Sequence, residues 1–182
     1  MKSLPKPTIR RTRIDYLAAA NGMSVTPDSW LHIMSSGRNA SPWTEVWSAR
    51  VFGLDISNNP NEAWSDATSN RGAAKYSFKT LTKNTFIGPS SGTGVKRKCT
   101  PEMIEEAISS VVAYVFTDVT QLPEISLVYV PASIIMKWWK EGSLGKNGRP
   151  SHKKFYALLG ARETQWVNFI TGEDIAIEER NM

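Results

Sequence analysis

Apolar residues recur with the period of a helix in several segments of this chain. The clearest segment begins at Thr100-Pro101-Glu102, where a capping threonine, a proline and an acid are typical of a helix start. Its expected buried stripe comprises Ile104, Ala107, Ile108, Val111, Val112 and Val115. Thr26-Pro27-Asp28 and Ser41-Pro42 predict two more helix starts, and further helices are expected near 12–21 and 132–140.

The helix expected from Ser41 to Gly53 has its own apolar stripe. That stripe comprises Trp43, Val46, Trp47 and Val51, and Glu45 lies beside it.

Other segments have the period of a strand. In 74–81, Ala74, Tyr76, Phe78 and Thr80 fall on one face and Lys75, Ser77, Lys79 and Leu81 on the other. A short strand within 63–69 and a turn at Asn70-Arg71-Gly72 complete a hairpin with it. The unbroken apolar run 125–130 predicts a central strand that is buried on both faces.

These elements predict the fold class. The strand 74–81, the helix from Thr100 and the strand 125–130 suggest one parallel crossover. Further strands are expected at 155–159 and 164–170, whereas 1–9 and 141–151 look irregular. We therefore expect an α/β protein, a single domain over 1–182, with a mixed central sheet flanked by helices.

Composition narrows the function classes. The 182 residues include 22 Lys+Arg and 17 Asp+Glu, which gives a net charge of +5, but only one Cys and two His. These counts argue against an internal disulfide, a Cys-rich zinc site and a Ser-His-Asp triad. No run approaches the ~20 apolar residues that cross a bilayer. The basic start lacks the apolar stretch of a secretory signal, so we expect a cytoplasmic protein.

The positive charge is concentrated in segments. One is the N-terminal arm, 1–13, which we expect to be a frayed tail. The others are 96–98 and 137–154, and a DNA-recognition segment is expected over 137–170 because Lys, Arg and Asn suit phosphates and base edges. The candidate DNA contacts are Lys96, Arg97, Lys98, Lys137, Lys140, Lys146, Asn147, Arg149, Lys153 and Lys154.

The order of acidic and basic residues on these elements bears on the function. Glu45 lies on a helix, Asp66 on the short strand that follows, and Ser77-Phe78-Lys79 on the next strand. Over about residues 42–130 this order resembles the PD-(D/E)xK nuclease superfamily, typified by type II restriction endonucleases. The resemblance implies a restriction-endonuclease-like core of helix, strand meander, helix and strand.

The resemblance also implies roles. Asp66 would bind Mg²⁺, the backbone carbonyl of Phe78 would complete the metal shell, and Lys79 would position or deprotonate the attacking water. Ser77 departs from the family pattern, which has an acid there, and would only hydrogen-bond a water near the metal. Glu45 is the favoured second carboxylate.

Other acids remain open for these roles. Glu102, Glu105 and Glu106 are alternatives for the second carboxylate, and Asp55 or Glu62 could replace Asp66.

The functional expectation is a Mg²⁺-dependent endonuclease that cuts double-stranded DNA at specific sequences and acts as a homodimer, because two strands need two active sites. Two alternatives stay open. One is a non-catalytic DNA-binding protein that uses the basic loops and aromatic residues, and the other is a structural or interaction protein.

Overall fold

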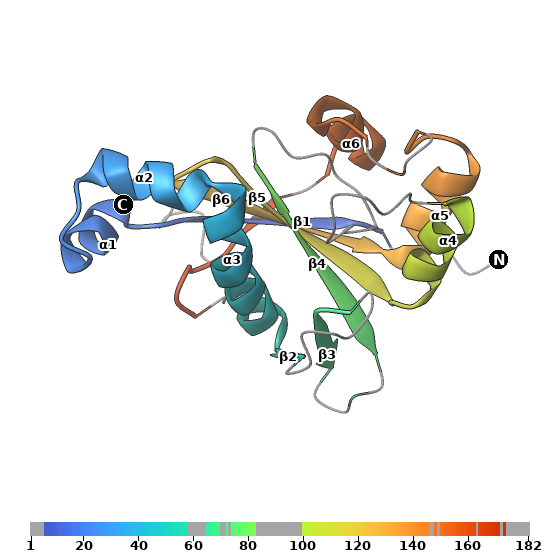
Figure 1. The fold of residues 1–182 in the computed structure, drawn as a ribbon, viewed down its shortest axis with the longest axis horizontal. Helices are drawn as coiled ribbons and strands as arrows, with labels where there is room; N and C mark the ends of the chain where they lie inside the picture. The colour runs from blue at the N-terminus through green and yellow to red at the C-terminus, as the bar shows by residue number, and fades with distance from the viewer. Residues whose placement is uncertain are drawn as a thin grey trace.

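The computed structural model describes residues 6–57, 65–69, 72, 74–82, 100–145, 148, 150–162, 164–171 and 173. In this part of the chain a seven-stranded mixed sheet has the order β2-β3-β4-β5-β6-β1-β7 (Figure 1). The strands are β1 (Thr8–Arg13), β2 (Leu54–Ile56), β3 (Ala67–Ser69), β4 (Lys75–Leu81), β5 (Ala113–Gln121), β6 (Glu124–Pro131) and β7 (Thr164–Trp166). The helices are α1 (Tyr16–Gly22), α2 (Pro27–Ser35), α3 (Gly37–Phe52), α4 (Pro101–Ser109), α5 (Ala132–Lys140) and α6 (His152–Leu159).

Strand direction changes along the sheet. β2, β3 and β4 form an antiparallel meander, and β4 and β5 pair in parallel through the crossover helix α4. β6 returns antiparallel to β5, and β1 inserts antiparallel beside it. β7 closes the sheet in parallel with β1. The α/β class with a mixed central sheet flanked by helices is therefore confirmed.

Helices cover both faces of the sheet. Ile104, Trp138 and Phe155, from α4, α5 and α6, pack against one face with Phe116 of β5. Ala20, Trp30 and Trp47, from α1, α2 and α3, pack against the other face. In Figure 1, α1 and α2 lie at the left and α4 and α5 at the right, with the strands running between them. The result is a three-layer arrangement with two apolar cores.

Local sequence signals place several elements correctly. Thr26 and Thr100 cap α2 and α4, and each hydroxyl accepts a hydrogen bond from a backbone N–H three residues later. The period-two pattern of 74–81 is confirmed by β4, and the run 125–130 lies in β6.

The helix predicted to start at Ser41 begins earlier, at Gly37, and Pro42 lies inside it. The predicted stripe of this helix is wrong at Val46, which is 58% exposed, whereas Trp47 is buried.

The crossover was assigned to the wrong strand. α4 ends at Ser109, and 113–121 form β5, so Val115 belongs to a strand and Val112 is 47% exposed. The parallel partner of β4 is therefore β5 rather than the strand at 125–130. The run from Val111 to Phe116 is apolar throughout and has no Gly or Pro before it, so helical and strand patterns are both compatible with it.

Two further predictions are wrong. Part of the N-terminal arm, 8–13, is strand β1 between β6 and β7 instead of a frayed tail, and α1 starts only at Tyr16. The expected strand at 155–159 lies in helix α6, where Ser151 caps the start and Phe155 and Leu159 are buried one helical turn apart. The strand expected at 164–170 is confirmed only for β7.

Candidate active site

Strand β4 divides its side chains between the two layers. Phe78 belongs to the core beneath α3, and Thr80 meets Thr44 of α3 with 2.6 Å between the hydroxyl oxygens. Leu81 belongs to the core beneath α4, α5 and α6. Because side chains alternate along a strand, Ser77 and Lys79 belong to the same face as Leu81.

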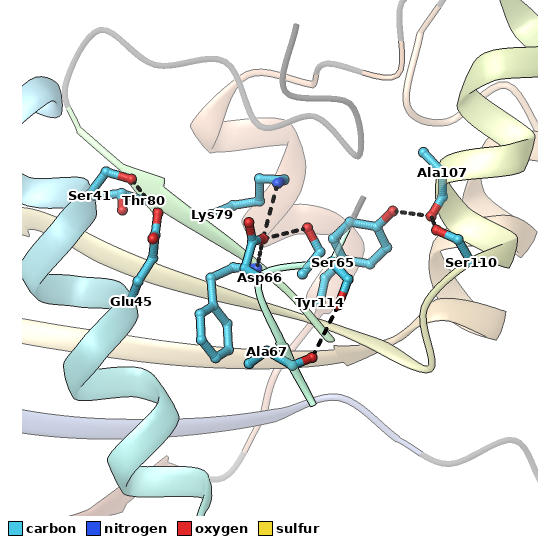
Figure 2. Close-up of polar contacts among 12 residues, drawn as sticks. Ser41, Glu45, Ser65, Asp66, Ala67, Lys79, Thr80, Ala107, Ser110 and Tyr114 are labelled. Carbon is cyan, nitrogen blue, oxygen red and sulfur yellow. Dashed lines mark hydrogen bonds and ion pairs between the residues drawn. The ribbon is translucent and has the colours of Figure 1, made fainter. Parts of the chain in front are cut away.

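Asp66 lies where the pairing of β3 with β4 ends. The last pair of these strands is Ala67 with Tyr76, and the backbone N–H of Phe78 lies just beyond it. Oδ2 of Asp66 accepts a hydrogen bond from this N–H at 2.6 Å and another from the Ser77 hydroxyl at 3.0 Å (Figure 2). The carboxylate thus takes the place of a missing strand neighbour and is held firmly against β4.

Lys79 brings a cation to the same carboxylate. Its Nζ lies 3.7 Å from Oδ2 of Asp66, and the two side chains are 15% and 34% exposed. The Lys79 side chain directs its ammonium toward Asp66, as Figure 2 shows. Asp66, Ser77, Phe78 and Lys79 therefore form one cluster, as the sequence predicted.

Glu45 approaches the cluster from α3. Its Oε1 accepts a hydrogen bond of 2.6 Å from Ser41, one turn earlier in the helix. Burial raises the pKa of Glu45 above its ordinary value of 4.5, the Ser41 hydrogen bond lowers it, the Asp66 charge raises it and the Lys79 charge lowers it. Glu45 is thus electrostatically coupled to both Asp66 and Lys79.

The oxygen atoms present are of the kind that Mg²⁺ prefers. Among the described residues there is no cluster of three or more His, Cys, Asp or Glu side chains that could hold a metal. Mg²⁺, however, commonly binds one or two carboxylates and completes its shell with water and substrate phosphate. Asp66 and Glu45 supply carboxylates, and the Phe78 carbonyl projects to the same strand edge as its N–H. The residues therefore fit the ion.

The alternative acids lie elsewhere. Glu105 accepts a hydrogen bond of 3.2 Å from the indole of Trp139, and Glu102 and Glu106 are exposed on α4. Asp55 lies in the edge strand β2, where it pairs with Thr68 of β3. Glu62 is outside the described residues.

Sequence reasoning missed two neighbours of the site. Ser41 was read as a helix cap, but its hydroxyl holds Glu45. Tyr114 of β5 pairs in register with Ser77, and its hydroxyl donates to the Ala107 carbonyl at 3.1 Å. Burial, with a further contribution from the Asp66 charge, raises the pKa of Tyr114. The serine-to-glutamate spacing of four residues was the available signal for Ser41.

The candidate DNA contacts are only partly described. Lys137 and Lys140 are exposed on α5, and Lys153 and Lys154 are exposed on α6. Nζ of Lys137 lies 3.9 Å from Oε1 of Glu141. These four lysines lie on helices that cover the sheet face of Lys79. The other candidates, Lys96, Arg97, Lys98, Lys146, Asn147 and Arg149, lie outside the described residues.

Comparisons with protein-family models, curated proteins and solved structures find no match to this chain. Within the described residues, none of the helices has the length and apolar character needed to cross a membrane.

Proposed function

We propose that this protein is a Mg²⁺-dependent endonuclease that hydrolyses phosphodiester bonds of double-stranded DNA in the manner of type II restriction enzymes. The observation that carries the proposal is the cluster on β4. Asp66 and Lys79 come from different strands, yet they lie 3.7 Å apart, and Glu45 from α3 is coupled to both.

The order of elements supports the proposal. Between 37 and 121 the chain runs helix, antiparallel three-stranded meander, helix and parallel strand, which is the order of the restriction-endonuclease-like core. Asp66 comes at the start of the second meander strand and Lys79 within the third, as in that family. The serine at position 77 is the departure, and Glu45 is the acid that compensates for it.

Each side chain then has a role in hydrolysis. Asp66 and Glu45, with the Phe78 carbonyl, would hold the ion, which supplies Lewis-acid polarisation of the phosphate and a lower pKa for water. Lys79 orients the attacking water and counters the negative charge that develops on the phosphate oxygens. Ser77 and the N–H of Phe78 keep the Asp66 carboxylate fixed, so that little reorganisation is needed.

The enzyme would cut both strands as a homodimer, because one active site contacts one scissile phosphate and a palindromic site has two. Exposed lysines on α5 and α6 would contact the DNA backbone on the same side as Lys79.

The test is cleavage of a long duplex that contains every six-base sequence, with Mg²⁺ or with EDTA. Wild type should give fragments only with Mg²⁺, and Lys79→Ala should lose roughly 10²- to 10⁴-fold in rate. Lys75→Ala is the matched control, because Lys75 lies on the same strand and face but is exposed and four residues away. Equal losses in both variants, or no Mg²⁺-dependent cutting by folded wild type, would overturn the proposal.

A further inference from the structure

A second polar site lies on the same face of the sheet. A pocket of about 280 Å³ opens between β1, β5, β6 and the start of α6. Every residue that lines it is polar or charged, among them Arg11, Asp118, Thr120, Ser126, His152 and Tyr156. A pocket without an apolar lining does not suit a hydrophobic ligand.

The strand register explains why these residues meet. Arg11 of β1 pairs with Ser126 of β6, and Ser126 pairs with Asp118 of β5. Asp118 in turn pairs with Leu81 of β4, two residues beyond Lys79. Residues paired across strands share a face, so Arg11, Ser126 and Asp118 lie on the same face as Lys79. From the strand geometry, the Cα atoms of Lys79 and Asp118 are about 8 Å apart.

The floor of the pocket is a buried carboxylate whose hydrogen bonds are already made. Oδ1 of Asp118 accepts from the Thr120 backbone N–H at 2.9 Å and from its hydroxyl at 2.6 Å. Oδ2 accepts from the Tyr156 hydroxyl at 2.5 Å. These donors spread the negative charge of Asp118, which is only 6% exposed, and they fix its orientation.

Two residues around Asp118, Arg11 and His152, have N–H groups that can donate hydrogen bonds to a ligand. Arg11 lines the pocket, and within the described residues its guanidinium, which has five N–H donors, makes no hydrogen bond or ion pair. Nδ1 of His152 lies 3.9 Å from Oδ2 of Asp118, so the carboxylate faces the imidazole ring. Nε2 of His152 is buried and has no hydrogen-bond partner within the described part of the chain. A buried ring nitrogen of this kind requires a partner.

We infer that this pocket binds a phosphate group, with Arg11 and His152 as the ligands and Asp118 as the residue that positions His152. A planar guanidinium and an imidazole N–H can both donate hydrogen bonds to phosphate oxygens. Lys153 and Lys154, which follow His152 in the first turn of α6, are exposed and add positive charge to this end of the helix. This inference rests on the proposed function and deepens it: the phosphate is one of the DNA backbone, near the phosphate that is cut.

The test is duplex binding in EDTA, where no cutting occurs, measured by fluorescence anisotropy over a range of salt concentrations. Arg11→Gln and His152→Gln should each weaken binding about tenfold and reduce the salt slope by about one. Arg13→Gln is the matched control. It removes the same charge from the same strand and face, but Arg13 does not line the pocket. Its affinity should change much less.

A second measurement follows the His152 ring protons by NMR while inorganic phosphate is added. Wild type should shift, and Arg11→Gln should not. Equal losses of affinity in the Arg11 and Arg13 variants would mean diffuse attraction and overturn the inference. Unchanged duplex binding with a phosphate-induced NMR shift would assign the pocket to a free phosphate and overturn the DNA assignment.

These measurements also distinguish failure of the phosphate pocket from failure of the proposed function. If the wild type does not bind duplex DNA at all, both proposals fall. If Arg11→Gln and His152→Gln bind and cleave like wild type, the phosphate pocket alone is wrong and the nuclease proposal stands.

Discussion

The ammonium of Lys79 and the carboxylate of Asp66 face each other at 3.7 Å across the end of the β3–β4 pairing. Oδ2 of Asp66 thus has a cationic partner in the protein itself. In the proposed nuclease, Mg²⁺ would compete with this ammonium for the same oxygen, so the pair would set both the affinity for the ion and the position of Lys79.

The first prediction separates these two effects. Lys79→Ala should abolish most cleavage, yet it should raise the affinity for Mg²⁺ by roughly tenfold because the competing cation is gone. At saturating Mg²⁺ this adds about 1.4 kcal/mol of stabilisation, or a few degrees in Tm. Thermal unfolding with and without Mg²⁺ measures it. A smaller Mg²⁺-induced shift in Lys79→Ala than in Lys75→Ala would contradict this account of the site.

A second prediction concerns the departure at position 77. Ser77 is 1% exposed, and its hydroxyl donates to Asp66. Ser77→Asp should lower the free energy of unfolding by about 1–3 kcal/mol without Mg²⁺, because a new carboxylate at a buried position then faces that of Asp66. Mg²⁺ should restore most of that loss. Ser77→Ala is the control, and its stability should depend on Mg²⁺ no more than that of wild type. Failure of Mg²⁺ to rescue Ser77→Asp would argue against a metal here.

A third prediction follows from the raised pKa of Glu45, whose main cause is burial. Since the native state favours protonated Glu45, its contribution to stability is fully present below the unfolded pKa of 4.5 and is lost as pH rises through the higher folded pKa. Glu45→Gln keeps an acceptor for Ser41 without the charge. It should match wild type at pH 4 and exceed it in unfolding free energy at pH 8, measured with urea. If Glu45→Gln were less stable than wild type at pH 8, the native state would favour ionised Glu45 and the prediction would be wrong.

A fourth prediction concerns the contact between α3 and the sheet. The hydroxyls of Ser48 and Thr117 are both buried and lie 2.7 Å apart. Ser48→Ala and Thr117→Val should each cost about 1–3 kcal/mol, because each leaves the other hydroxyl without its partner. The double variant should cost clearly less than the sum. Additive losses in a double-mutant cycle would show that the two hydroxyls do not depend on each other.

Much of the fold could be predicted wherever a local signal decides it. The threonine caps of α2 and α4 and the period of β4 are properties of a few neighbouring residues. β5 could not be placed, because 113–116 are apolar and follow the apolar stripe of α4 with no Gly or Pro between them. The position of β1 depends on pairing with 124–129, which no local pattern of 8–13 encodes.

The part of the candidate site that depends on local spacing could also be predicted from the sequence. Ser77 and Lys79 are two residues apart, so a strand places them together whatever the rest of the fold does. Asp66 required the hairpin to form as predicted. The coupling of Glu45 depends on the tilt of α3 over β4, and the meeting of Arg11 with Asp118 depends on three strands whose order cannot be read from spacing.

The position of β1 between β6 and β7 also has a consequence for how the chain reaches its native state. During synthesis β1 is made some 115 residues before its partner β6, and β7 follows later still. Until then 8–13 carry unpaired backbone groups and three arginines. That charge protects the waiting strand from pairing with other chains. Completion of the sheet is therefore a late event that joins segments far apart in the sequence.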